Sequence, residues 1–82
     1  MVQYIELIKI HATWCGPCKR LALILEDFGV EAKAYDVDTL EGQEMAMKYD
    51  VRTVPLLIYG DKRCDSSDAV KVKAFLEECD LI

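Results

Sequence analysis

The first third of the chain changes from a strand pattern to a helix pattern. Residues 2–12 are rich in Ile and Leu, and their apolar positions fall on both parities, which predicts a central strand covered on both faces. From Cys18 the apolar residues follow helical spacing, and Gly29 stands where a C-terminal cap belongs. The apolar positions of this segment are Leu21, Ala22, Leu25 and Phe28. The segment is therefore expected to form the first helix.

The middle of the chain repeats this alternation. Residues 30–37 predict a second strand, and Thr39 can cap a second helix that extends to about Tyr49. The residues expected on the inner face of this helix are Leu40, Ala46 or Met47, and Val51. Gly42 is expected to weaken the helix, because glycine has a low helix propensity.

The last part of the chain has the pattern of a hairpin followed by a helix. Residues 55–59 predict a third strand, residues 60–61 (Gly-Asp) a turn, and residues 62–64 a short partner strand. One of the polar residues 66–68 can then cap a last helix. The apolar stripe of that helix consists of Val72, Phe75, Leu76 and Cys79.

The order of these elements predicts the fold class. A β-α-β-α-β-β-α succession favours an α/β fold with a four-stranded mixed sheet and helices on both faces. The chain has 82 residues, enough for one hydrophobic core, so residues 1–82 are expected to form a single domain. With 52% hydrophobic and 30% charged residues, the composition is that of a globular protein.

Charge and hydropathy disfavour several classes of partner. The net charge of −5 argues against nucleic acid, because phosphate backbones are bound mainly through Lys and Arg. The sequence holds no apolar stretch near the roughly 18 residues that a membrane span needs. Met1 is followed by a mixed segment without a basic region typical of a secretory signal, so we expect a cytoplasmic protein. A monomer is the expected oligomeric state.

Four cysteines are the main carriers of chemistry in this sequence. Cys15 and Cys18 form a C-x-x-C pair, which is typical of a redox-active dithiol or of half a metal site. A zinc site needs a second pair with ligand-like spacing, which Cys64 and Cys79 do not supply, and His11 is the single histidine. We therefore expect neither a metal nor a bound cofactor. Cys64 and Cys79 are expected to be ordinary thiols, with a regulatory disulfide as the alternative.

The C-x-x-C pair stands where the first strand gives way to the first helix. A helix N-terminus stabilises an anion, so the pKa of Cys15 is expected to fall from about 8.5 toward about 7. Pro17 suits the first helical turn, and Gly16 permits close approach of a partner backbone. The Cys15 thiolate would attack a substrate disulfide, and Cys18, expected to be the less exposed thiol, would resolve the mixed disulfide.

Two segments carry a resemblance to a known family. Residues 14–19, Trp-Cys-Gly-Pro-Cys-Lys, resemble the active-site signature of the thioredoxin superfamily, and residues 53–55, Thr-Val-Pro, resemble its cis-proline segment. The resemblance implies the thioredoxin fold, a cis Pro55 packed against the cysteines, and a Val54 backbone that pairs with the substrate chain. With Thr53, these residues would form the substrate-binding segment. A trans proline that opens an edge strand is the alternative. Trp14 is either core packing or a surface platform beside the pair, and the motif favours the platform.

The resemblance also implies an activity. A thioredoxin is a protein-disulfide oxidoreductase and electron carrier, reduced by a flavin- and NADPH-dependent thioredoxin reductase. The chain is similar to glutaredoxins in size, and Cys64-Asp65 resembles the segment with which glutaredoxins hold glutathione, so a glutathione-dependent reductase is the alternative. Gly16-Pro17 opposes it, since glutaredoxins usually carry Pro-Tyr there. A binding module that uses the Pro55 groove is a third possibility, although both cysteines are intact.

Some positions depart from the thioredoxin pattern. Lys9 occupies the position of a buried Asp that handles protons in thioredoxins, so an Asp-like relay does not transfer to this chain. Lys9 is either a strand lysine that reaches solvent or a partly buried ammonium that favours the thiolates. His11 either tunes the pair or simply ends the strand. Lys19 and Arg20, with Arg52, either collect positive charge around the pair or belong to a solvated surface.

Overall fold

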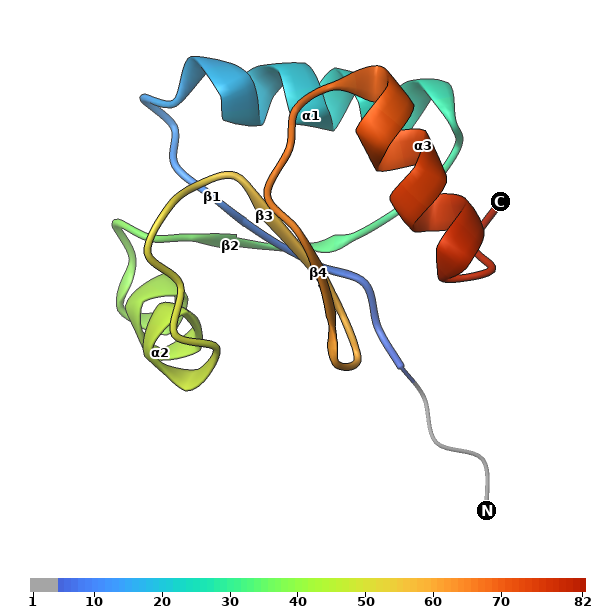
Figure 1. The fold of residues 1–82 in the computed structure, drawn as a ribbon. Coiled ribbons are helices and arrows are strands. Elements are labelled where there is room, and N and C mark those ends of the chain that lie inside the picture. The colour runs from blue at the N-terminus through green and yellow to red at the C-terminus, as the bar shows by residue number, and fades with distance from the viewer. Residues whose placement is uncertain (1–4) are drawn as a thin grey trace.

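The computed structural model describes residues 5–82, which form four strands and three helices (Figure 1). In chain order these are β1 (Ile8–His11), α1 (Gly16–Asp27), β2 (Lys33–Asp36), α2 (Leu40–Lys48), β3 (Leu56–Tyr59), β4 (Lys62–Cys64) and α3 (Ala69–Glu78). This succession confirms the predicted order. Residues 2–4 of the predicted first strand lie outside the described residues, and residues 5–7 are not part of a strand. The first strand therefore begins later than its apolar pattern indicates.

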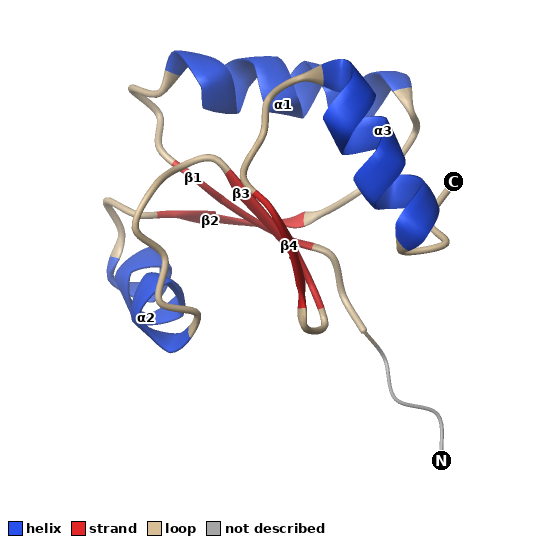
Figure 2. Cartoon of the chain, in the orientation of Figure 1, coloured by secondary structure: helices blue, strands red, loops and turns tan. Residues whose placement is uncertain are grey.

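The four strands form one mixed sheet in the order β2-β1-β3-β4. β1 is parallel to β2, with Ile8 opposite Lys33, and antiparallel to β3, with Ile10 opposite Leu56. β3 and β4 form an antiparallel hairpin. α1 and α3 lie above the sheet in Figure 2 and α2 lies below it. The predicted four-stranded mixed sheet with helices on both faces is confirmed.

The segment around β1 contributes to a core on each face of the sheet, because successive strand residues point to opposite sides. Ile10, which is fully buried, packs with Leu56 and Ile58 on the face that α2 covers. Leu7 belongs to the core under α1 and α3. Burial on both faces explains why apolar residues occupy both parities of this segment.

The larger core lies between the sheet and the two helices above it. Its buried residues are Leu7, Leu21, Leu25, Leu57, Val72, Phe75, Leu76 and Cys79, which include the whole predicted stripe of α3. Asp68 caps α3, and its carboxylate accepts a hydrogen bond from the Val70 N–H at 3.0 Å. After α1, Gly29 takes a φ of 66°, which glycine adopts without steric cost.

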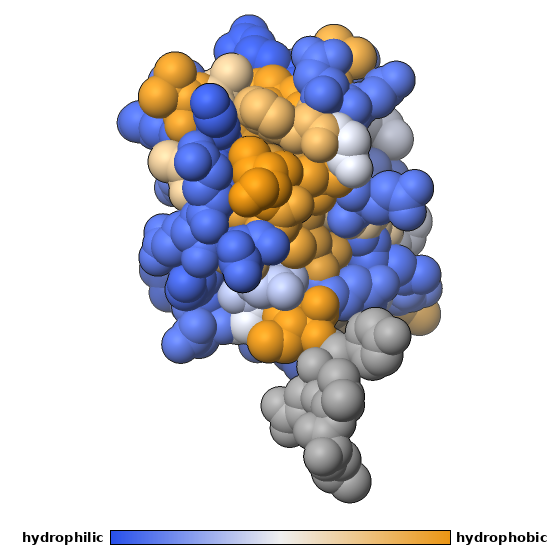
Figure 3. Space-filling view, turned by 90° about the vertical axis from the view of Figure 1, so that its right-hand side faces the viewer, coloured by the Kyte–Doolittle hydropathy of each residue, from blue (hydrophilic) through white to orange (hydrophobic). Residues whose placement is uncertain are grey.

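One side of this core stays partly open to solvent. Phe28, Val30, Ala32 and Leu81 pack against the core but are only half-buried. Figure 3 views the side of the molecule that carries α3 and the C-terminus, and it shows an apolar band between charged surfaces. This side lies away from the N-terminus of α1 (Figure 1), so the band is remote from the cysteine pair.

The inner face of α2 differs from the predicted one. Leu40 was expected to face the sheet but is 74% exposed. Of the two alternatives Ala46 and Met47, Ala46 is half-buried, whereas Met47 is 83% exposed. Met45 and Tyr49 pack against the sheet instead, together with Val51, which was expected there. Thr39 caps the helix as predicted, because its hydroxyl oxygen accepts the Gly42 N–H at 3.0 Å.

Gly42 explains this difference. It is buried, and a Cβ at this position would collide with the carbonyl group of Asp36 at the end of β2. The helix backbone therefore approaches β2 most closely at Gly42, and the residues that share its face are those at positions 45, 46 and 49. The low helix propensity of Gly42 is thus accompanied by close packing of α2 on the end of β2, which a larger residue would prevent.

Candidate active site at the Cys15–Cys18 disulfide

Cys15 and Cys18 form a disulfide at the N-terminus of α1, with their Cα atoms 5.2 Å apart. β1 ends at His11, and the loop after it turns sharply, since the Cys15 N–H donates to the Ala12 carbonyl at 3.2 Å. Cys15 keeps an extended backbone and is the N-cap of the helix. The end of β1 and the start of α1 thus place the two sulfurs at one edge of the sheet.

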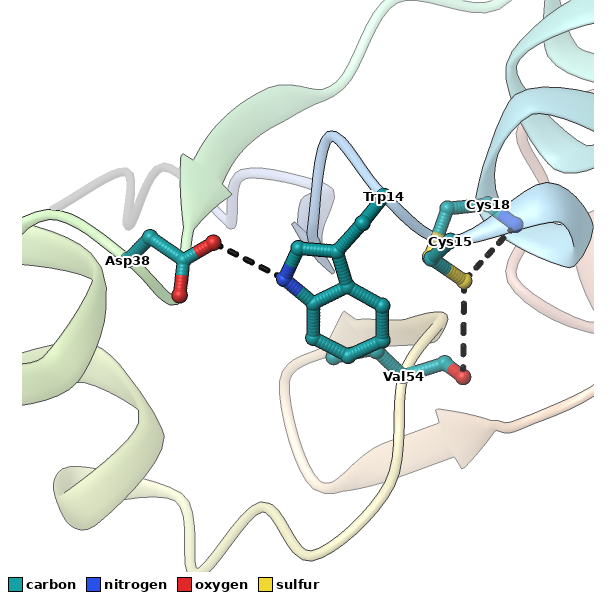
Figure 4. Close-up of a disulfide and its surroundings, with 5 residues drawn as sticks. All are labelled: Trp14, Cys15, Cys18, Asp38 and Val54. Atoms are coloured by element: carbon teal, nitrogen blue, oxygen red, sulfur yellow. Dashed lines mark hydrogen bonds between the residues drawn. A yellow bond between two sulfur atoms is a disulfide. The ribbon is translucent and has the colours of Figure 1, made fainter.

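The Cys15 sulfur takes the place that an oxygen occupies in an ordinary N-cap. Its Sγ accepts a hydrogen bond from the Cys18 N–H at 3.2 Å (Figure 4). A donor at this distance and the positive end of the helix dipole both favour a negative charge on Cys15. Gly16 and Pro17 form the first positions of α1, where the missing proline N–H costs no hydrogen bond. The residues predicted to activate Cys15 are therefore in place.

Both cysteines are buried, with Cys15 6% and Cys18 3% exposed. They form a small apolar cluster with Ala12, and Val37 and Val54 pack against it. Cys18 is the less exposed of the two, as predicted, by a small margin. Trp14 and Gly16, which flank Cys15, are exposed, so this side of the pair faces solvent.

The peptide bond between Val54 and Pro55 is cis, which confirms the expectation from the Thr-Val-Pro segment. Pro55 is buried, and the Val54 carbonyl oxygen lies 3.9 Å from the Cys15 Sγ. The sulfur of a disulfide carries no hydrogen, so this is a contact between the Cys15 sulfur and the Val54 oxygen. The segment after α2 and the segment before α1 thus meet at Cys15 (Figure 4).

Trp14 is 68% exposed, which confirms the surface position rather than core packing. Its Nε1 donates a hydrogen bond to Asp38 Oδ2 at 2.9 Å. The indole is one wall of a cavity of about 260 Å³ beside the disulfide. The lining residues are Trp14, Val37, Ala46, Val51, Arg52, Thr53 and Val54. The structure therefore brings together Trp14, Thr53 and Val54, the residues proposed for substrate binding.

Asp38 and Val37 belong to this site but were missed in the sequence. They follow β2, and Trp14 follows β1, the parallel neighbour of β2. Parallel strands end at the same edge of a sheet, and loops after neighbouring strands meet there. The predicted order of the elements contained the information that could have found them. A helix between the first two strands makes these strands parallel, and the loops after them then lie close together.

A second cavity, of about 280 Å³, opens on the other side of Cys18. Lys9, His11 and Lys19 line it, together with Thr13 and the small side chains of Ala12 and Ala22. Lys9 is half-buried, and burial lowers the pKa of its ammonium group from the usual 10.5. The ammonium group of Lys9 is therefore partly withdrawn from water, and its effect on the thiolates stays a prediction. His11 is also half-buried.

A third cavity, of about 460 Å³, is lined by charges of both signs. Its residues are Asp50, Arg52, Thr53, Leu56, Arg63 and Asp65. Arg52 forms an exposed ion pair with Asp50, with 3.5 Å between the nitrogen and the oxygen. Lys19 and Arg52 thus line different cavities, and Arg20 lies exposed on α1.

The remaining two cysteines lie on the hairpin and on α3. Both are free thiols. Cys79 is buried in the larger core, and Cys64 is half-buried against it. Burial raises the pKa of Cys79, which keeps it protonated and unreactive. In the part of the chain that the structure describes, no group of three or more His, Cys, Asp or Glu side chains could hold a metal ion. No helix among residues 5–82 is both long and apolar enough to cross a bilayer.

Comparisons with known proteins agree with this site. The family model of thioredoxin matches residues 2–78. Thioredoxin of Staphylococcus aureus is 40% identical over 58 residues, which cover 66% of this chain and 56% of the relative. The matched segment thus spans little more than half the length of that relative.

Solved structures give the same result. Thioredoxin of the yeast Malassezia sympodialis superimposes with a TM-score of 0.76 at 26% identity, over 90% of this chain and 73% of that one. A glutaredoxin–glutathione complex from buckwheat superimposes with a TM-score of 0.67 at 24% identity, over 95% and 82% of the two chains, and shows likeness of fold alone. With its C-x-x-C disulfide, its cis proline and a family match over nearly its whole length, the chain belongs to the thioredoxin family.

Proposed function

We propose that this protein is a thiol–disulfide oxidoreductase that reduces disulfides in other proteins. The Cys15 thiolate attacks one sulfur of the substrate disulfide, and the other substrate sulfur leaves as a thiolate and takes up a proton. Cys18 then attacks Cys15 in the mixed disulfide, which releases the second substrate sulfur and leaves the Cys15–Cys18 disulfide. Two electrons pass from the dithiol to the substrate.

The observation that carries this proposal is the hydrogen bond from the Cys18 N–H to the Cys15 Sγ. A sulfur that caps a helix is stabilised as a thiolate, the reactive form of cysteine. The Val54 carbonyl beside it belongs to a segment that precedes a buried strand, and an extended substrate chain can pair with such a segment. The apolar cavity next to Trp14 would hold a substrate side chain near the disulfide.

The electron donor in this proposal is a flavin-containing thioredoxin reductase that uses NADPH. The family match and the Gly16-Pro17 spacer support this donor. The protein itself binds no cofactor and acts through its own disulfide, as a monomeric carrier in the cytoplasm.

Glutathione is the second candidate donor, and the charged cavity beside Thr53 favours it. The cavity combines Arg52 and Arg63 with Asp50 and Asp65, so it offers partners for both the carboxylates and the ammonium group of a small peptide. It also contains Thr53, next to the Val54 carbonyl that contacts Cys15.

The two donors are separated by an insulin-reduction assay with purified protein. One reaction contains thioredoxin reductase and NADPH, and the other contains glutathione, glutathione reductase and NADPH. We expect turnover in the first reaction, and the Cys15→Ser variant should be inactive in both. Turnover with glutathione alone would assign the protein to the second candidate, and failure of both reactions would remove the proposed activity.

A further inference from the structure

We propose that Lys9 is a positioning residue for the second half of this reaction: its ammonium group stabilises the Cys18 thiolate that attacks Cys15 in the mixed disulfide. This inference rests on the proposed function and assigns a role to the cavity behind Cys18.

The geometry places Lys9 and Cys18 at one cavity. Lys9 lies in the middle of β1, between Ala34 of β2 and Leu57 of β3. Lys9 and Cys18 both line the cavity of about 280 Å³ under the start of α1. No acidic residue contributes to this lining, and Lys9 takes part in neither of the two ion pairs found among residues 5–82. The ammonium group therefore has no carboxylate partner there.

Cys18 needs such a charge more than Cys15 does. Cys15 receives the N–H hydrogen bond at the helix N-terminus, whereas Cys18 supplies it and is 3% exposed. Burial opposes ionisation of a thiol unless an opposite charge lies nearby. Lys9 is half-buried, and burial lowers its own pKa, which indicates that its ammonium group is partly withdrawn from water. In such surroundings an ammonium and a thiolate attract each other more strongly than in bulk water.

The step is balanced without a further reactant. The Cys18 thiol loses its proton to solvent and Lys9 keeps its own. The Cys18 sulfur then bonds to the Cys15 sulfur, the bond between Cys15 and the partner breaks, and the partner sulfur leaves as a thiolate that solvent protonates. Lys9 thus lowers the cost of forming the attacking thiolate and does not touch the substrate.

Two other charged or titratable groups face the same cavity: His11 from β1 and Lys19 from α1. Lys19 is exposed, so water and salt weaken its effect on a buried sulfur. His11 is half-buried and lies two residues from Lys9 on the same strand. Every variant compared with the wild type therefore retains His11 and Lys19.

The test separates the two thiols in time. Reduced protein, in excess, reacts in a stopped-flow instrument with 5,5′-dithiobis(2-nitrobenzoate), whose thiolate product is coloured. The first coloured thiolate appears when Cys15 attacks, at a rate that depends on protein concentration. The second appears when Cys18 resolves the mixed disulfide, at a rate that does not. The double variant Cys15→Ser/Cys18→Ser measures the background reaction of Cys64 and Cys79.

Lys9→Met should slow the second phase about tenfold at pH 7. The midpoint of this phase, which is the pH at which its rate is half of the maximum, should rise by about one unit. Its first phase should stay within about twofold of the wild-type rate, because the helix N-terminus still activates Cys15. Lys9→Arg, which keeps the charge, should retain the wild-type midpoint, and so should Lys33→Met, an exposed lysine on the edge strand β2. If Lys9→Met does not fold, Lys9→Gln takes its place.

An unchanged second phase in Lys9→Met would overturn the inference while leaving the proposed function intact. A midpoint that rises in Lys9→Arg as it does in Lys9→Met would also overturn the inference, because packing rather than charge would then explain the effect of Lys9. Failure of the proposed function would look different: the wild-type protein would show no fast first phase and would not reduce insulin.

Discussion

The indole Nε1 of Trp14 donates a hydrogen bond to the Oδ2 of Asp38 at 2.9 Å. Trp14 follows β1 and Asp38 follows β2, so this bond joins two loops at the edge of the sheet where the disulfide lies (Figure 4). The Asp38 N–H in turn donates to the Asp36 carboxylate at 2.8 Å. An exposed tryptophan is thereby held as the wall of the apolar cavity beside Cys15.

Removal of this bond should weaken substrate binding. Replacing Asp38 with Ala frees the indole, and the loss of one exposed hydrogen bond, about 0.5–1.5 kcal/mol, should raise KM for insulin about threefold while kcat stays within about twofold. The fluorescence of Trp14, the single tryptophan, should change in the same variant. Asp61→Ala, in the exposed turn between β3 and β4, is the control and should leave both readings unchanged. An unaltered KM in Asp38→Ala would show that the bond has no part in binding.

Replacement of Cys18 with Ser should trap the mixed disulfide. Cys15 keeps its helix N-terminus and still attacks, but no thiol remains to release the substrate. Mass spectrometry after incubation with an oxidised substrate protein should find a covalent adduct at Cys15. The Cys15→Ser variant should give none. Adducts that form through Cys18 in that variant would reverse the roles of the two cysteines.

Replacement of Gly42 with Ala should destabilise the fold although alanine is the better helix former. The new Cβ would collide with the backbone of Asp36, so α2 must move away from β2. Overpacking of this kind should lower the free energy of unfolding by about 2 kcal/mol, measured by urea denaturation. Gln43→Ala, at the exposed neighbouring position, should stay within about 0.5 kcal/mol of the wild type. A stabilised Gly42→Ala protein would contradict the close packing of α2 on β2.

The oxidised protein should become more stable at neutral pH when Lys9 is replaced with Met. Burial lowers the pKa of Lys9 below 10.5, so the folded state binds this proton less tightly than the unfolded state does. The charged Lys9 therefore lowers the free energy of unfolding. This destabilisation is fully present below the folded-state pKa of Lys9 and disappears as the pH rises from there toward 10.5. The stability gain of Lys9→Met, measured by urea denaturation, should therefore shrink as the pH approaches 10.5. A difference that is constant with pH would show that Lys9 is not desolvated.

If the further inference also holds, the same substitution stabilises the fold and slows the resolving step. A charge that costs stability and serves the reaction is a known compromise at active sites. Measurement of both effects on one variant tests whether Lys9 is such a case.

The sequence by itself was sufficient for the order of the elements and for the reactive pair. The succession of strands and helices, the Thr39 cap, a cap among residues 66–68 and the apolar stripe of α3 follow from local patterns, and the structure has them as predicted. The C-x-x-C pair at the start of a helix and the Thr-Val-Pro segment are local as well. Such features depend on residues that are close together in the chain.

Only the tertiary structure decided which helix face is inside and which residues complete the site. Leu40 was predicted on the inner face of α2, and the sequence left Ala46 and Met47 as alternatives there. Because the helix backbone approaches Asp36 at Gly42, Ala46 is half-buried, while Leu40 and Met47 are exposed. Nothing in the sequence distinguishes Asp38 from other acidic loop residues. The parallel pairing of β1 and β2 brings it to Trp14. The environment of Lys9 likewise depends on α1 packing above β1. These relationships join residues far apart in the chain, and local patterns carry no information about them.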